Sequence, residues 1–226
     1  MGAMTDVRER DPELPGRLLT TERDALVPLL RQRADDDYAR PVEACPGWSV
    51  RDVLAHCSAA LKRVVEGRYE PGVFTPENNA RDIAERSAWS NARIVDELER
   101  GMTEAGPVMA GSDGRMDLIA LGEWVHAGDV REALGEPNAY GGPGLPHALT
   151  LLAWGTQTLG HIPLQADLDD VDEPLRLGGV GVDQHRHVAR FIGDSATLVR
   201  LYAGRPTAGA AYELTGVEPR ELNIFG

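Results

Sequence analysis

The stretch from Ala44 to Cys57 constrains the fold more than any other part of the chain. It begins with a Cys-Pro-Gly turn, which ends any preceding helix because proline fixes φ and glycine permits positive φ. Ser49 is then expected to cap a new helix, and Asp52 can complete a capping box. This helix is predicted to run to about Arg68, because its apolar residues recur at helical spacing.

His56 lies on the apolar side of that predicted helix, one turn before Ala60. A histidine in this place is either a hydrogen-bonded core residue or a ligand that points into the protein. Taken alone, the stretch favours the core residue, because buried histidines are common and ligands are rare.

A second stretch changes this balance. Residues 122–135 are predicted to form a helix that ends at Gly135. Its residues Glu123, His126 and Asp129 follow one another at intervals of three and therefore lie along one side of the helix. Helical bundles build metal sites from one histidine on each of two helices and a carboxylate one turn away.

The remaining pattern predicts a mainly α chain with a smaller α/β part. The Gly- and Pro-rich segment 136–146 marks the boundary, so we expect domains at residues 1–144 and 145–226. Further helices are predicted at 17–34, 77–102, 116–134 and 147–159, and from Asp194 or Ser195 to about 203. Short strands are predicted at 162–168, 174–177, 187–192 and 212–215.

Two sequence motifs carry a family resemblance. The string C-P-G-W-S-V-R-D-V-L-A-H and the later string E-W-V-H-A-G-D-V-R-E-A-L-G resemble the mycothiol-dependent maleylpyruvate isomerase family. The segment from Gly193 to Pro206 is similar to the family's C-terminal domain. The resemblance implies an N-terminal DinB-like four-helix bundle with a metal site, followed by a C-terminal α/β cap domain.

In this family a divalent metal, usually zinc, is held by a histidine on the second helix and by an acid and a histidine on the fourth. The resemblance places these histidines at His56 and His126. The usual position of the acid is Gly122, whereas Glu123 is rotated from it by about 100° around the helix. Either Glu123 ligates after a local adjustment, or Asp129 or water takes its place, or the metal site is weakened.

The resemblance also suggests residues around the site. Asn79 and Arg81 open the third predicted helix and are candidates to face the thiol cofactor, although capping and solvation are the favoured roles there. Arg205 matches an arginine that reaches from the second domain of the family toward the active site, where its fork would suit a carboxylate. A cation that closes a helix C-terminus explains Arg205 equally well.

Charge and composition exclude several classes of partner. The formal net charge of −13 argues against nucleic acid and anionic membranes, which need clustered cations. No stretch of apolar residues is long enough to span a membrane. The N-terminus has no basic-then-apolar signal, so a cytoplasmic location is expected. We also expect a monomer or small homo-oligomer. The chain is rich in Arg, Ala and Gly, and Lys62 is its sole lysine. This composition resembles that of proteins from GC-rich actinobacteria, which make mycothiol.

The other cysteines and histidines have plainer interpretations. Cys45 and Cys57 do not form a disulfide framework, and Cys57 is expected to be a small core residue rather than a nucleophile. The remaining histidines are interpreted as surface residues, because no acid or third ligand lies near them in the sequence; they are His147, His161, His185 and His187.

The leading hypothesis is therefore a metal-dependent enzyme of thiol chemistry. Zinc or another divalent metal would keep one position open for the thiol of a small cofactor, mycothiol by resemblance, and would deprotonate it. The bound thiolate would attack a small electrophile, and the product would be either an isomer or an S-conjugate. The alternative is a non-catalytic small-molecule-binding or structural bundle protein that has lost the full metal site, which Gly122 supports.

Overall fold

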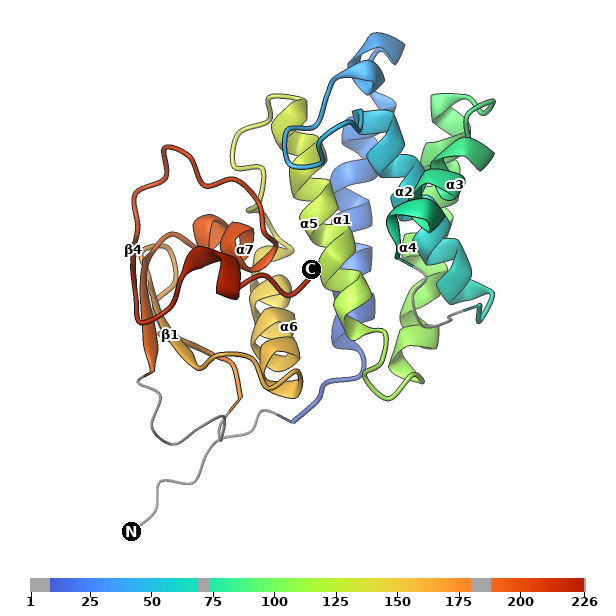
Figure 1. The fold of residues 1–226 in the computed structure, drawn as a ribbon. Coiled ribbons are helices and arrows are strands. Elements are labelled where there is room, and N and C mark those ends of the chain that lie inside the picture. The colour runs from blue at the N-terminus through green and yellow to red at the C-terminus, as the bar shows by residue number, and fades with distance from the viewer. Residues whose placement is uncertain (1–8, 69–73, 180–187, 226) are drawn as a thin grey trace. The chain divides into compact units, whose positions relative to one another are not determined.

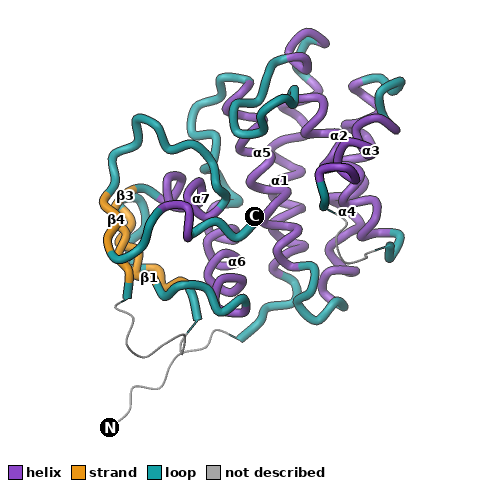
Figure 2. Tube along the Cα trace, viewed as in Figure 1, coloured by secondary structure: helices purple, strands orange, loops and turns teal. Residues whose placement is uncertain are grey.

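The computed structural model describes residues 9–68, 74–179 and 188–225. The chain divides into two compact units: one is Pro12–Gly144, and the other combines the chain from Leu145 onward with the residues before Pro12 (Figure 1). The first unit is helical, and the second combines helices with a small sheet (Figure 2). The prediction of a mainly α chain with a smaller α/β part is confirmed.

The helical unit is a bundle with one additional short helix. Helices α1, α2, α4 and α5 form the bundle, α1 packs against both α4 and α5, and α3 packs against α2. A short 3-10 turn, Asp35–Ala39, lies between α1 and α2. The helices are α1 Leu14–Arg31, α2 Val50–Val65, α3 Pro76–Glu85, α4 Asn91–Ala110 and α5 Asp117–Ala133.

The start of α2 agrees with the sequence. The Ser49 hydroxyl accepts from the backbone N–H of Asp52 at 3.3 Å, and the Asp52 carboxylate accepts from the Ser49 N–H at 2.9 Å. This capping box fixes where the helix begins and therefore which residues face the core. The helix ends at Val65, slightly before the predicted end near residue 68.

The prediction of one helix over 77–102 is wrong, because the chain breaks between α3 and α4. Ser90 caps α4 by accepting from a backbone N–H of its first turn. The Arg51 guanidinium, which comes from α2, donates to the carbonyls of Arg86 and Trp89 at 2.9 and 2.6 Å. These bonds satisfy carbonyls that a continuing helix would have used.

Two glycines bring α1 and α4 into close contact. A Cβ atom on Gly106 would lie 2.9 Å from the Cα of Gly16, which is shorter than real side chains allow. The absence of side chains at both positions is therefore what permits this separation of the two backbones.

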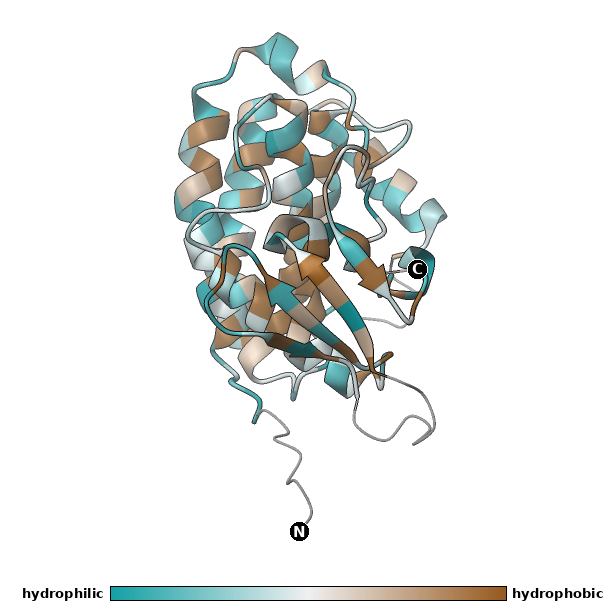
Figure 3. Cartoon of the chain, turned by 90° about the vertical axis from the view of Figure 1, so that its left-hand side faces the viewer, coloured by the Kyte–Doolittle hydropathy of each residue, from teal (hydrophilic) through white to brown (hydrophobic). Residues whose placement is uncertain are grey.

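The second unit contains a four-stranded sheet in the order β2-β1-β3-β4. Strands β1 and β3 are parallel, and the other two pairings are antiparallel. Hydrophobic and hydrophilic residues alternate along the strands, so one face is buried (Figure 3). The elements are α6 Leu145–Thr158, β1 Leu164–Leu168, β2 Leu175–Leu177, β3 Ala189–Gly193, α7 Ser195–Tyr202, β4 Glu213–Thr215 and a 3-10 turn at Pro219–Glu221.

The ends of these elements follow local signals. Asp194 caps α7 by accepting from the backbone N–H of Thr197 at 2.8 Å, so the first of the two predicted caps is the one used. None of the helices in the described ranges has the length and apolar character that crossing a membrane requires.

Candidate metal centre

The two histidines predicted as ligands are neighbours in the bundle. His56 on α2 and His126 on α5 have ring centroids 5.4 Å apart in an edge-to-face arrangement. The Trp48 and Phe74 rings lie 5.2 and 6.2 Å from the His56 ring. His56 is buried, and its Nδ1 has no hydrogen-bond partner. A buried nitrogen without a partner is unusual and indicates a site for a ligand, an ion or water.

The surroundings of His56 keep its ring neutral. Burial, assisted by the charges of His126 and Arg63, lowers the pKa of His56 to about 3. A neutral imidazole has a free lone pair, which is the form that binds metals.

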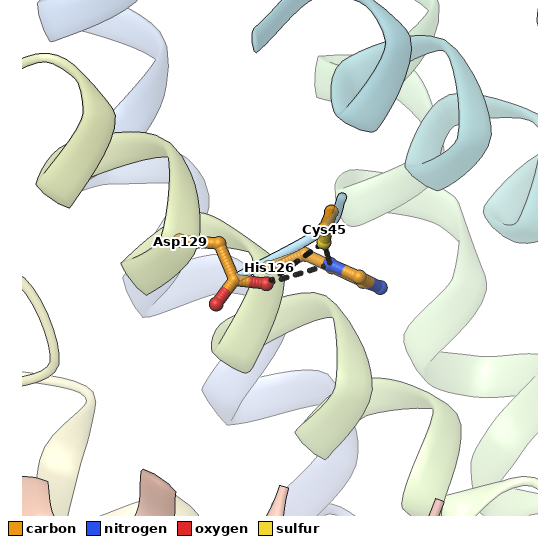
Figure 4. Close-up of side chains that lie close together, drawn as sticks. All are labelled: Cys45, His126 and Asp129. Atoms are coloured by element: carbon orange, nitrogen blue, oxygen red, sulfur yellow. Dashed lines mark hydrogen bonds and ion pairs between the residues drawn. The ribbon is translucent and has the colours of Figure 1, made fainter. Parts of the chain in front are cut away.

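A second group of side chains lies around the Nδ1 atom of His126 (Figure 4). The Nδ1 atom of His126 lies 3.0 Å from Asp129 Oδ2, and Cys45 Sγ lies 3.6 Å from the same oxygen and 3.9 Å from Nδ1. Within the described ranges, these three residues form a His, Cys and carboxylate group whose ligand atoms all lie within 4.8 Å of one another.

Cys45 is the residue of this group that the sequence did not indicate. Its position at the start of the turn before α2 was noted, but no local pattern links it to a helix that begins at Asp117. The turn carries Cys45 to α5 only in the folded bundle. Tyr140, which donates its hydroxyl hydrogen to Asp129 Oδ1, was missed for the same reason.

Glu123 has a different environment from Asp129. It is buried and makes a hydrogen bond with the Cys57 thiol, while its Oε2 atom has no partner. Burial raises the pKa of Glu123 to about 8, although the Cys57 bond opposes this. Glu123 and His126 both line a cavity of about 10 Å³, which is roughly the space for one water molecule.

Burial also raises the pKa of the Cys57 thiol well above its ordinary value, with the Glu123 charge acting in the same direction. Such a thiol stays protonated and is a poor nucleophile. This agrees with the interpretation of Cys57 as a core residue.

The candidate cofactor residues on α3 differ from each other. Asn79 lies in the first turns of α3 with its Oδ1 buried and without a partner. Arg81 donates to Asn78 at the surface, at 2.7 Å. Next to Asn79 along the same face, Asp82 pairs with Arg63 of α2, and Arg63 Nη1 is also buried without a partner. Polar atoms with unused hydrogen-bonding capacity therefore lie on α2, which carries His56, and on α3, which packs against α2.

Arg205 lies just after α7, in the other unit. Its Nη1 donates to the carbonyl of Ala203 at 3.2 Å, and its backbone N–H donates to the carbonyl of Arg200 at 2.8 Å. These bonds tie the residue to the C-terminal end of α7, and its catalytic role stays a prediction.

The interpretation of the remaining histidines as surface residues needs correction at His161. Its ring lies 5.8 Å from that of Tyr202, and its Nδ1 is buried without a partner. Burial lowers the pKa of His161. His147 is half-buried, and His185 and His187 lie outside the described residues.

The fold and the histidine pair define the class: a DinB-like helical bundle with a candidate metal site, joined to an α/β part. Residues 19–111 match the family described as the mycothiol maleylpyruvate isomerase N-terminal domain. The resemblance predicted from the two motifs is thereby confirmed. The matched segment includes His56 and Asn79 and ends before His126.

Two solved structures share the fold. The crystal structure of the mycothiol-dependent maleylpyruvate isomerase has a TM-score of 0.54 and 17% identity, and the match covers 96% of this chain and 98% of that chain. A histidine-to-alanine mutant of the mycothiol-dependent maleylpyruvate isomerase has a TM-score of 0.53 at the same identity and coverage. No curated protein sequence matches this chain. At this identity the likeness establishes the fold.

Proposed function

We propose that this protein is a metal-dependent enzyme that uses mycothiol to isomerise a small electrophile. The observation that carries the proposal is the buried pair of His56 and His126, in a unit whose residues 19–111 match the mycothiol maleylpyruvate isomerase domain. Transfer of the thiol to the electrophile is the alternative outcome at the same site. The net charge of −13 supports small-molecule partners rather than nucleic acid, and we expect a monomer or small homo-oligomer in the cytoplasm.

The residues present fit a divalent metal such as zinc. His56 and His126 would hold it, and Glu123 or Asp129 would supply the carboxylate. Asp129 would otherwise accept a hydrogen bond from His126 and orient its ring. His56 Nδ1 and Glu123 Oε2 support this, because both are buried polar atoms without partners. When bound, such a metal supplies a Lewis acid that makes a thiol acidic.

We assign separate tasks to the other candidate residues. Trp48 and Phe74 shield the His56 ring from water, which strengthens electrostatic interactions there. Asn79 offers a buried acceptor to a hydroxyl or amide of the cofactor. Arg81 would contact only an exposed part of the cofactor, since it lies at the surface. Arg205 would orient a negatively charged group on the electrophile.

Removal of either histidine tests the proposal. The variants His56→Ala and His126→Ala should each lose zinc while keeping the helical circular-dichroism signal, because one truncation in a bundle core is tolerated. His161→Ala is the matched control, since it removes a partly buried histidine from the other unit. Full zinc occupancy by elemental analysis in both bundle variants would refute the site.

The reaction itself is tested with the zinc-loaded protein, mycothiol and a panel of electrophiles. Isomerisation returns the thiol unchanged, so product forms while the thiol concentration stays constant. S-transfer consumes one thiol for each conjugate formed. We expect turnover with mycothiol that disappears in both histidine variants, and turnover that is equal in wild type and variants would contradict the proposal.

One observation favours a non-catalytic binding or structural protein. Glu123 is bonded to Cys57, and burial raises its pKa to about 8, so the carboxyl is largely protonated at neutral pH. Metal ligands must be deprotonated. Elemental analysis separates the two functions, because about one zinc per chain that chelators remove supports the enzyme. A stably folded protein that takes up no zinc supports the non-catalytic binding or structural protein.

A further inference from the structure

The carboxylate of Asp129 receives hydrogen bonds from three side chains. His126 contributes its Nδ1, Cys45 its thiol and Tyr140 its hydroxyl. His126 lies one turn before Asp129 on α5, whereas Cys45 precedes α2 and Tyr140 follows α5. The Asp129 side chain is fully buried, with 0% of its surface exposed. A buried carboxylate that accepts several hydrogen bonds is held in one orientation.

We propose that Cys45 and Tyr140 are positioning residues that hold Asp129 as the acceptor for the N–H at Nδ1 of His126. A neutral imidazole carries one N–H and one lone pair, and a carboxylate can only accept. The bond to Asp129 therefore places the proton on Nδ1 and leaves the lone pair on Nε2. This inference rests on the proposed function in one respect, namely that Nε2 is the atom offered to a metal.

The direction of the His126 ring supports this assignment. Its Nδ1 faces Cys45 and Asp129, and its second ring nitrogen points away from them (Figure 4). The neighbour of this ring in the bundle is His56, whose Nδ1 is buried without a partner. Cys45 Sγ, His126 Nδ1 and a carboxylate oxygen of Asp129 are close enough to hold a metal themselves. However, metal binding there would require the thiol of Cys45 to lose its proton and the proton of His126 to move from Nδ1 to Nε2.

The space for Tyr140 is provided by a glycine on α5. A Cβ atom on Gly128 would lie 2.5 Å from Cδ1 of the Tyr140 ring. Gly128 therefore lets the ring come close enough to the helix for its hydroxyl to reach the adjacent residue, Asp129. Tyr140 is itself 1% exposed. The contact is thus part of the packed core rather than a chance surface bond.

The test uses full-length protein with Tyr140→Phe, Cys45→Ala and Cys45→Ser. The serine variant retains a donor at this position, and Tyr202→Phe is a matched control that removes a buried tyrosine hydroxyl without a partner. The first measurement is long-range ¹H–¹⁵N NMR of histidine side chains in the metal-free protein, which reports the tautomer directly. The second is the zinc dissociation constant by competition with a chelating dye.

We expect His126 of the wild type to carry its proton on Nδ1. Tyr140→Phe and Cys45→Ala should each raise the population of the other tautomer and weaken zinc binding by about 10-fold, the lower end of losses for residues that orient metal ligands. Cys45→Ser should restore most of the loss, and Tyr202→Phe should change neither quantity.

Two results would overturn the proposal. One is an Nε2-protonated His126 in the metal-free wild type. The other is complete loss of zinc in both Cys45 variants, together with a thiolate-to-metal absorption band in cobalt-loaded wild type, since this would make Cys45 a ligand. If the wild type binds no zinc, the proposed function fails, but the tautomer measurement still tests the network.

Discussion

Glu123 places a carboxyl group in the core of the bundle, with the Cys57 thiol as its hydrogen-bond partner. Burial removes the water that would stabilise the charged form, and this raises the pKa of Glu123 from 4.5 to about 8. Between these two pKa values, the carboxyl group of Glu123 keeps its proton in the folded metal-free protein and loses it in the unfolded chain. The stability of the protein must therefore depend on pH through this residue.

The sign of the dependence follows from the raised pKa. The stabilising contribution of Glu123 is complete below about pH 4.5 and is lost as the pH rises to about 8. Glu123→Gln removes the titration, so the free energy of unfolding of wild type should fall relative to the variant across this window. The slope should be at most about 1.4 kcal/mol per pH unit. Urea unfolding of both chelated proteins at several pH values measures it, and parallel pH profiles would contradict the prediction.

Local sequence was enough to place His56 and His126 on two predicted helices, because the start, apolar face and end of each helix are encoded nearby; their role as metal ligands stays a prediction. Local sequence could not find Cys45 or Tyr140. Asp129 is distant in sequence from Cys45, and only the packing of the turn before α2 against α5 brings these two together. Tyr140 reaches Asp129 through the loop that follows α5. The sequence also left open whether Glu123 or Asp129 completes the metal site. Burial and hydrogen-bond partners set the protonation and orientation of a carboxylate, and both depend on the folded structure.

At the scale of elements, the break between α3 and α4 shows where periodicity misleads. The apolar spacing continues through residues 86–90, so it predicted one helix. The break is stabilised by Arg51 of α2, which occupies carbonyls at the end of α3, and by Arg93, whose guanidinium stacks on Trp89 at 3.8 Å from the ring centroid. Ser90 was a local signal for a cap, but the Arg51 contact is tertiary and therefore invisible in the local pattern.

The contact between α1 and α4 gives a prediction for helix packing. Gly106→Ala places a methyl group 2.9 Å from Gly16 Cα, and this neighbour is backbone that cannot rotate away. We expect the two helices to separate and the free energy of unfolding to fall by about 1–3 kcal/mol, the usual cost of overpacking. Chemical denaturation measures the change.

Gly111→Ala is the matched control, because its nearest neighbours would lie 3.7 Å from the new methyl group and its φ of −77° suits alanine. Its stability should stay equal or rise slightly. Equal stabilities for Gly106→Ala and wild type would show that the helices tolerate a larger separation than the glycine pair suggests.

At the scale of the whole molecule, the chain has two compact units, and composition changes at the Gly- and Pro-rich segment between them. Alternating residues were enough to predict the short strands. They could not predict that β1 pairs in parallel with β3 while β2 pairs at the other edge of β1. Strand order depends on the crossover through space, which no single strand encodes.

Arg205 belongs to the α/β unit and is tied to the end of α7, whereas the proposed ligands belong to the bundle. If Arg205 orients a carboxylate on the electrophile, Arg205→Lys should lower kcat/KM for acidic electrophiles by about 10-fold or more, because lysine cannot form the paired bonds of a guanidinium. Neutral electrophiles should be affected much less, and zinc content should not change. Steady-state kinetics on matched acid and amide substrates measures the difference. Equal activity on every substrate would leave Arg205 as a cation that stabilises the C-terminal end of α7.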